Sequence, residues 1–170
     1  MRSRPMSVWF AAGAAVALAA CHAQSRERRP LDAAADSGFA GVQRRGAVVM
    51  GVDQYTSRHV FEPLPDGGRI ELERSVDDSV GAAQIRRHML MIARQFSAGD
   101  FCLPGIVHDR EVPGTRVMAE RRALISYTVE SLPRGSAVRV RSSDSAAVRA
   151  IHEFLAFQRQ DHHASARHDS

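Results

Sequence analysis

The sequence contains eight histidines among 170 residues, and three of those within the segment that we expect to fold, His59, His88 and His108, fall on three different predicted elements. Neutral imidazole is the commonest metal ligand among side chains and suits both zinc and copper. No two of the three have the short spacing of an H-E-x-x-H or C-x-x-C motif, so only tertiary structure could bring them to one ion. The sharpest interpretation of the set is therefore a metal site assembled from three separate elements.

The fourth ligand of such a site would differ between zinc and copper. A water molecule there would suit zinc, whereas the sulfur of Met91 or Met118 would suit copper. The alternative to a metal site is that the three histidines have separate structural roles. Each ring would then be partly buried and hydrogen-bonded to a carboxylate or a carbonyl group.

The other histidines of interest lie near the C-terminus. His152 is on the flank of a predicted helix, and we expect it to be a packing residue with a satisfied ring nitrogen. His162, His163 and His168 follow the predicted end of that helix, where a protonated imidazole is favoured by the helix dipole. We expect them to lie at a solvated, fraying end that binds metal weakly at most.

A predicted β-hairpin positions His59. The stretch HVFEPLPDGGRIELE alternates apolar and polar residues on both sides of Asp66–Gly68, which is a strong hairpin signal. Cross-strand pairing would put His59 and Phe61 on the buried face, together with the apolar residues of the second strand. Val60 and Glu62 would point to the other face.

A predicted helix and the loop after it position the other two histidines. The stretch DDSVGAAQIRRHMLMIARQFSAGDF has the acidic cap, apolar stripe and glycine stop of a helix, and His88 lies on the flank of its stripe. His108 lies in the following stretch, CLPGIVHDREVPGTRVMAE, whose length indicates a functional loop or a short helical turn. We expect Cys102, at its start, to be a buried, unpaired thiol.

The two halves of the folded segment share a pattern. LPDGGRIELERSVDDSVGAAQI and LPRGSAVRVRSSDSAAVRAI both contain a hairpin turn, a strand, an acidic cap and a helix, about 66 residues apart. The pattern predicts an α+β fold in which a duplicated ββα unit gives a four-stranded antiparallel sheet with two helices on one face. Independent use of ordinary hairpin and cap chemistry is the alternative to duplication.

The first residues have the layout of an export signal. Arg2 and Arg4 precede an uncharged stretch, Met6–Ala20, which is shorter than the roughly 20 residues that a membrane-spanning helix needs. Leu18–Cys21 resembles the bacterial lipobox, in which the cysteine receives a diacylglyceryl thioether. The alternative is ordinary signal cleavage that leaves Cys21 as a thiol. Both place the mature chain outside the cytoplasm, and the first would anchor it to the envelope membrane, on the periplasmic side in a Gram-negative cell.

These signals predict four segments. Residues 1–20 form a lipoprotein signal peptide, and residues 21–46, which are polar and rich in small residues, form a disordered tether. Residues 47–163 form a single α+β domain, and residues 164–170 form a disordered tail.

Composition excludes one class of partner and gives little support to catalysis. The 21 arginines that remain after signal removal are interspersed with 19 acidic residues, whereas nucleic-acid binding favours a clustered basic stripe with stacking aromatics. The chain contains no G-x-S-x-G elbow, glycine-rich phosphate loop or catalytic Cys-His signature. Asp161–His163 resembles the motif of the DHH phosphodiesterases and His108-Asp109 that of the HD phosphohydrolases, but both lack the accompanying ligands. We therefore favour a non-catalytic role, although activity stays an open question at this stage.

Four stretches together resemble a family of small exported bacterial proteins: VDQYTSRHVFEPLPDGGRIEL, IRRHMLMIARQFSAGDF, PGIVHDREVPGT and AIHEFLAFQRQDHH. The resemblance spans Met50 to His163. It implies that histidines matching His59, His88 and His108 recur, and it implies no particular activity. We expect a lipid-anchored envelope protein with a non-catalytic binding role, in its sharpest form the binding of copper or zinc by these three histidines. The alternative is a structural or protein-interaction lipoprotein without metal.

Overall fold

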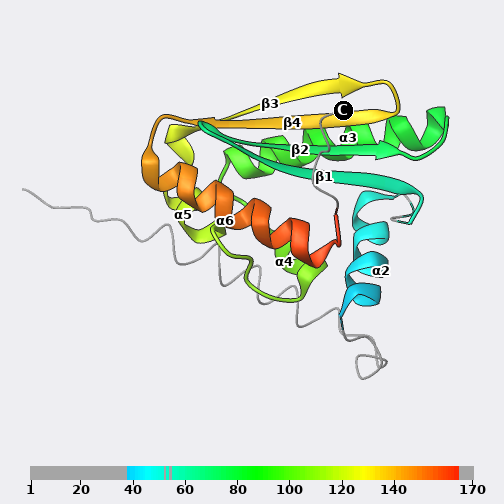
Figure 1. Ribbon diagram of the computed structural model, residues 1–170, viewed down its shortest axis with the longest axis horizontal. Helices are drawn as coiled ribbons and strands as arrows, with labels where there is room; N and C mark the ends of the chain where they lie inside the picture. Colours follow the sequence, from blue (N-terminus) through cyan, green and yellow to red (C-terminus); the bar gives the residue numbers. More distant parts are fainter. Residues whose placement is uncertain (1–37, 52, 54, 165–170) are drawn as a thin grey trace, which may run out of the picture. The chain divides into compact units, whose positions relative to one another are not determined.

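The computed structural model describes residues 38–51, 53 and 55–164 (Figure 1). The predicted signal peptide, Cys21, most of the predicted tether and the last six residues lie outside this part. The elements, in chain order, are α2 (Phe39–Met50), β1 (Ser57–Leu64), β2 (Gly67–Arg74), α3 (Ser79–Ser97), α4 (Cys102–His108), α5 (Thr115–Glu120), a short 3-10 helix (Arg122–Leu124), β3 (Ile125–Leu132), β4 (Gly135–Ser142) and α6 (Ser145–Asp161).

The four strands form one antiparallel sheet in the order β1-β2-β4-β3, so the predicted α+β fold is confirmed. Each hairpin closes through a two-residue turn, because Leu64 pairs with Gly67 and Leu132 pairs with Gly135. Gly135 also sits where β4 crosses close to β2. A Cβ at this position would lie 2.0 Å from the carbonyl oxygen of Leu72, so a larger residue would push the two hairpins apart.

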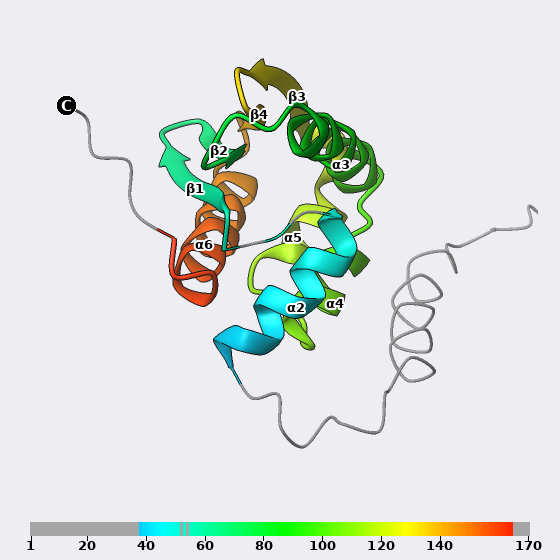
Figure 2. The ribbon, with the colours of Figure 1, turned by 90° about the vertical axis from the view of Figure 1, so that its right-hand side faces the viewer.

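Both long helices pack on the same face of the sheet. Figure 2 shows α6 beside β1 and β2, and α3 beside β3 and β4, and the inter-element contacts agree. The core between these layers is built from alternate residues of the strands and from the apolar stripes of the two helices. It includes Phe61, Ile70, Leu72, Val138, Val140, Ile85, Met89, Phe96, Ile151 and Leu155. Val60, which the alternation places on the other face, is also buried, with 3% of its surface exposed.

Each hairpin is followed by a helix that begins at an aspartate. Asp78 accepts a hydrogen bond from the backbone N–H of Gly81 at 2.9 Å, and Asp144 accepts one from Ala147 at 2.8 Å. These bonds satisfy amide groups that have no partner within the helix, which explains the acidic residues at both sites. The repeated order agrees with the predicted pattern, but whether it records a duplicated unit stays a prediction.

Helix α2 occupies part of the segment that the sequence assigned to a tether. Its buried residues include Gly41, Val42 and Gly46, and it packs mainly against α4. The side chain of Arg45 donates from Nε to the carbonyl oxygen of Val107 at 2.7 Å. The buried face of α2 is made largely of small residues, which allow a close approach between helices.

The connection between α3 and β3 is mostly helical, as α4, α5 and the 3-10 helix show. His108 is the last residue of α4 rather than a loop residue, and Asp109 follows it in the left-handed conformation (φ 52°). Cys102 begins α4 and is disulfide-bonded, so the prediction of an unpaired thiol is wrong. Because Cys21 is the only other cysteine in the sequence, lipid on its sulfur and an intramolecular disulfide exclude each other.

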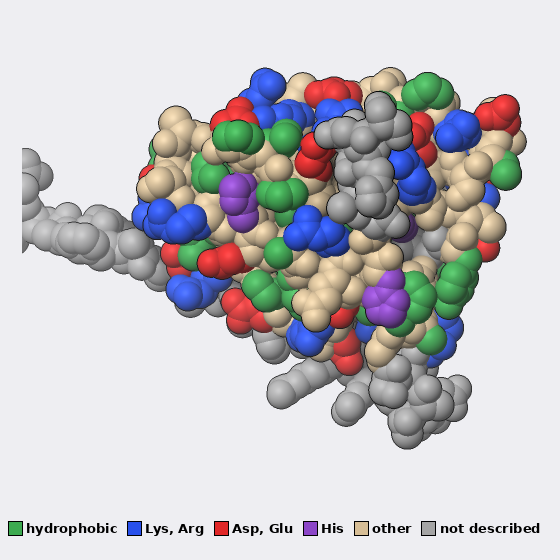
Figure 3. All heavy atoms as spheres, in the orientation of Figure 1, with side chains coloured by type: hydrophobic (Ala, Val, Ile, Leu, Met, Phe, Trp, Pro, Cys, Tyr) green, Lys and Arg blue, Asp and Glu red, His purple; other side chains and the backbone are tan. Residues whose placement is uncertain are grey.

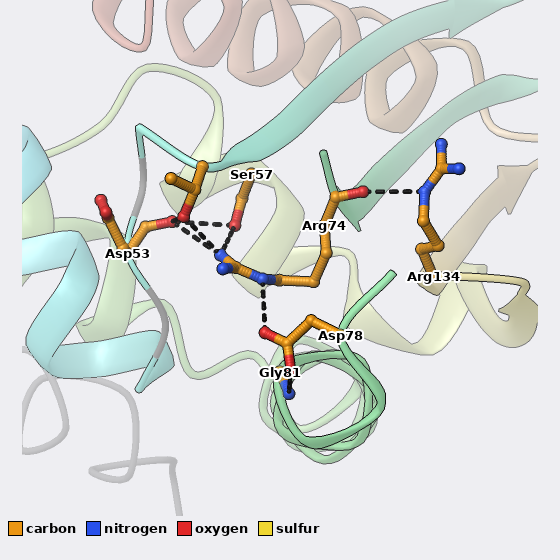
Figure 4. A network of polar contacts seen from close by, with 7 residues as sticks. Asp53, Ser57, Arg74, Asp78, Gly81 and Arg134 are labelled. Carbon is orange, nitrogen blue, oxygen red and sulfur yellow. Dashed lines mark hydrogen bonds and ion pairs between the residues drawn. The ribbon is translucent and has the colours of Figure 1, made fainter. Parts of the chain in front are cut away.

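Arg74, at the end of β2, joins the segment before β1 to the start of α3 (Figure 4). Its Nε donates to a carboxylate oxygen of Asp78 at 3.0 Å. Its Nη1 donates to the backbone oxygen of Asp53 at 3.3 Å and to the hydroxyl groups of Thr56 and Ser57 at 2.8 and 2.9 Å. The guanidinium group of Arg74 therefore links the segment between α2 and β1 to the start of α3.

The outer surface carries charges of both signs. On the face shown in Figure 3, arginine and carboxylate side chains lie among one another. Among the described residues, no helix combines the length and the apolar character that crossing a membrane would require.

Candidate functional site

The described part of the protein contains a partly open cavity of about 80 Å³ between β1, β2, α2, α3, α4 and α6. Most of its lining is apolar, but four of the lining residues are histidines. The lining consists of Gly46, Val49, Met50, His59, Phe61, Ile70, Leu72, His88, Met89, Ile92, Phe96, Leu103, Pro104, Val107, His108, Phe154, Gln158 and His162. An apolar cavity that holds benzene is close to 150 Å³, so this one is sized for an ion or a very small molecule.

His59 reaches the cavity from β1. It pairs with Leu72 across the hairpin while Phe61 pairs with Ile70, so the predicted register and the inward direction of His59 are confirmed. The Nε2 atom of His59 is buried and has no hydrogen-bond partner.

His88 reaches the cavity from α3. Only 7% of its surface is exposed, and its Nδ1 atom is buried without a hydrogen-bond partner. It lies next in sequence to Met89, which also lines the cavity. The predicted lean of His88 from the flank of the helical stripe toward the sheet is therefore confirmed.

His162 completes the set, and the sequence analysis missed it. Its ring is stacked on His59, with ring centroids 5.1 Å apart and planes at 21°, and its Nδ1 atom is also buried without a partner. The prediction of a solvated end at this position is wrong. The signal was present, because Ile151, Leu155 and Gln158 form a helical stripe whose next member, four residues on, is His162.

Burial keeps these three imidazoles uncharged. Removal from water lowers the pKa of His88 to about 4, and removal from water together with the smaller effect of the nearby His88 lowers the pKa of His59 to about 4. Burial, with smaller contributions from His59 and His108, lowers the pKa of His162 to about 2. At neutral pH each ring therefore has one nitrogen with a lone pair, the form in which histidine binds metals.

His108 lines the same cavity, but both of its ring nitrogens are already engaged. Nδ1 donates to a carboxylate oxygen of Asp161 at 2.5 Å, and Nε2 lies 3.1 Å from the amide oxygen of Gln158. Arg110 donates to the other oxygen of Asp161 at 2.9 Å. These contacts give His108 the structural role that was the alternative to metal binding, and they fix the last turn of α6 against α4.

The predicted set of His59, His88 and His108 therefore shares a cavity without offering three available nitrogens. Within residues 38–51, 53 and 55–164, no group of three or more histidine, cysteine, aspartate or glutamate side chains is arranged to hold a metal ion. The two sulfur ligands considered from sequence are also misplaced. Met91 is exposed, and Met118 is buried but does not line the cavity, whereas Met50 and Met89 do.

The chain was compared with protein families, curated proteins and solved structures. No family model, curated protein or solved structure matches it. The resemblance to small exported bacterial proteins consequently stays a prediction, and the function has to be argued from the cavity itself.

Proposed function

We propose that this protein binds a transition-metal ion in the histidine-lined cavity without catalysing a reaction, and that His59, His88 and His162 supply the nitrogen ligands. The observation that carries the proposal is the set of three buried imidazole nitrogens without partners, contributed by β1, α3 and the end of α6. A buried polar atom without a hydrogen-bond partner destabilises the fold by about 1–3 kcal/mol. A ligand that engaged all three nitrogens would remove this cost.

The size and lining of the cavity favour an ion over an organic ligand. Its volume of about 80 Å³ is well below the range of roughly 300–1,000 Å³ that holds cofactor-sized molecules. Its walls include no carboxylate and no hydroxyl group that could orient a substrate or transfer a proton. This arrangement supports storage or transfer of an ion more than it supports a reaction.

Binding would require the rings to turn. His59 and His162 are stacked nearly parallel, so their in-plane lone pairs do not meet at one point. Rotation about the Cβ–Cγ bond changes the plane of an imidazole and the direction of its nitrogens, so the side chains around the rings would have to move with them. The stacked arrangement of His59 and His162 is therefore the metal-free state, in which the two rings contact each other.

The test is metal binding by the full chain purified without chelators. Zn²⁺, Ni²⁺ and Cu⁺ (the last under anaerobic conditions) are titrated separately, and affinity and melting temperature are measured for each. We expect at least one to bind in a 1:1 ratio and to raise the free energy of unfolding by about 2.7 kcal/mol at a hundredfold excess over Kd.

Two variants make the assignment specific. His88→Leu removes an unpartnered nitrogen from the cavity and should weaken binding at least tenfold. His163→Asn is the control, because His163 is exposed, neighbours His162 and has a left-handed backbone (φ 49°) that asparagine tolerates. This variant loses the stacking of His163 on Phe39, with ring centroids 4.1 Å apart, so its metal-free melting temperature is measured together with its affinity. If no metal binds, or if the two variants bind equally well, the proposal is overturned and the structural or protein-interaction role takes its place.

A further inference from the structure

We propose that two copies of this chain pair along β3, the strand at one edge of the sheet, and so extend the four-stranded sheet to eight strands. Among the described elements only β4 forms a ladder with β3, and Figure 2 shows β3 at the side of the sheet next to α3. An edge strand presents a row of backbone N–H and C=O groups to a further strand, unless side chains or other elements protect it. The inference is independent of the proposed function, because β3 does not line the cavity.

The opposite edge of the sheet is protected. Strand β1 contains Pro63, which has no N–H to donate to a further strand. Helix α6 also engages this strand, since Nε2 of His152 lies 2.9 Å from the carbonyl oxygen of Leu64. In addition, Arg159 donates to the carbonyl oxygen of Phe61 at 3.4 Å. A proline and a covering helix are two of the ways in which proteins prevent pairing at a sheet edge.

Strand β3 lacks these protections. Its sequence, ISYTVESL, contains no proline, and its pairing with β4 runs without a bulge from Ile125 to Leu132. Its one charged residue is Glu130, and the carboxylate of this residue points toward the rest of the sheet, where Nη1 of Arg69 donates to it at 2.5 Å. The contrast between the two edges indicates that β3 is the one available for pairing.

The side chains of β3 suit pairing with an antiparallel copy of the same strand. With a twofold axis at Thr128, the two threonines lie opposite each other on the outer face of the sheet, away from α3 and α6. On the inner face, Tyr127 of each copy then lies opposite Val129 of the other. Threonine pairs and pairs of an aromatic with a β-branched residue stabilise antiparallel sheets. Twofold dimers are also the commonest oligomers, and they are formed by a self-complementary surface.

Charge favours this register over its neighbours. Glu130 lies two residues from the axis and faces Ser126 of the other copy, so the two carboxylates stay apart. Ser126 pairs with Arg141 on β4, and the side chain of Arg141 is 61% exposed, so each glutamate faces an arginine across one serine. An axis at Glu130 would instead place two carboxylates opposite each other, which is destabilising. Because β3 is complementary to itself in charge, a second copy is favoured over an unrelated strand.

Exposed apolar side chains flank the same edge. Leu124 immediately precedes β3 and is 53% exposed. Leu90 of α3 is 42% exposed and lies one turn after Arg86, whose Nη2 donates to the carbonyl oxygen of Leu132 at the end of β3. Leu90 is therefore on the β3 side of α3. Pairing of two β3 strands would bring both α3 helices to the same side of the joined sheet and cover part of this apolar surface.

The experiment measures self-association of the full chain by sedimentation equilibrium over a range of protein concentrations, in a density-matched detergent. We expect a reversible monomer–dimer equilibrium. Thr128→Lys places two cations opposite each other at the axis and should weaken dimerisation by roughly tenfold or more. Ser126→Lys is the matched control, because it is on the same face of β3, also pairs with an arginine of β4, and would face Glu130 of the other copy. Its dimer should be at least as stable as that of the wild type.

Cysteine substitutions test the register. Thr128→Cys should form an intermolecular disulfide with oxidised glutathione, because opposed residues of antiparallel strands have Cα atoms about 4.5–5.5 Å apart, which suits a disulfide. Ser126→Cys should not, because residue 126 would lie about 14 Å from its counterpart. Peptide mapping separates these linkages from those of the native cysteines. A wild-type chain that stays monomeric, a dimer that Thr128→Lys leaves intact, or equal cross-linking at both positions would overturn the inference.

Discussion

The three cavity histidines impose a cost on the fold that depends on pH. Each is uncharged in the folded protein because burial lowers its pKa, to about 4 for His59 and His88 and to about 2 for His162. In the unfolded chain the same rings titrate near 6.5. Between these values the unfolded state binds more protons than the folded state, so acid favours unfolding.

We predict that the metal-free protein is most stable above pH 6.5 and loses stability as the pH falls toward 4. Each histidine should contribute a loss of about 1 kcal/mol per pH unit in this window. Urea unfolding at intervals from pH 7.5 to 4.5 measures the effect. Because carboxylates also begin to titrate there, the comparison is with His59→Phe/His88→Leu, whose stability should fall less steeply. Parallel curves for the two proteins would refute the assignment to these histidines.

At the scale of elements, the cavity depends on how α2 and the first hairpin are held. Arg74 carries much of this connection, because its guanidinium contacts Asp53, Thr56, Ser57 and Asp78 at once. Asp78 is itself the cap of α3, so the same group supports the helix that carries His88. A single arginine therefore couples the two sides of the cavity through backbone and side-chain contacts.

We predict that Arg74→Met lowers the free energy of unfolding by about 1–3 kcal/mol, since it removes several hydrogen bonds and keeps most of the apolar stem. Hydrogen exchange should accelerate at the start of α3 and at residues 55–57 more than in β4. Arg116→Met serves as the comparison, because Arg116 is exposed and its ion-pair partner, Glu120, is exposed on the same helix. Equal exchange in Arg74→Met and the wild type would show that the network does not hold these segments.

At the scale of the whole molecule, export and anchoring stay proposals that concern residues outside the described part. We propose that the chain is exported and, as the alternative to a disulfide that uses Cys21, that this residue carries a lipid that attaches the chain to the envelope membrane. The disulfide at Cys102 agrees with an oxidising compartment. It also sets up a test, because the sulfur of Cys21 can be either lipidated or disulfide-bonded within the chain.

We predict that the cellular protein fractionates with membranes, and that its intact mass includes a diacylglyceryl group that Cys21→Ser abolishes. If Cys21 is lipidated, mild reduction should expose one thiol to a labelling reagent, that of Cys102, and no second cysteine should become labelled. A water-soluble chain that gains two labelled thiols on reduction would instead establish the Cys21–Cys102 disulfide and exclude the anchor.

The sequence predicted the sheet and its two main helices because their signals are local. Alternation around Asp66 fixed the first hairpin, and Asp78 and Asp144 marked the helix starts. The site was predicted only in part. His59 and His88 follow from strand and helix periodicity, whereas the engagement of His108 by Asp161 depends on residues 53 positions apart. Helix α2 was missed because its buried residues, Gly41, Val42, Gln43 and Gly46, are mostly small or polar, a composition that also suits a tether.

The walls of the cavity span almost the entire folded chain, from Gly46 on α2 to His162 just beyond α6. A polypeptide whose final helix has not yet emerged from the ribosome therefore lacks one side of this cavity. If the ion is bound as proposed, it binds only after residue 162 has been synthesised and the chain has folded.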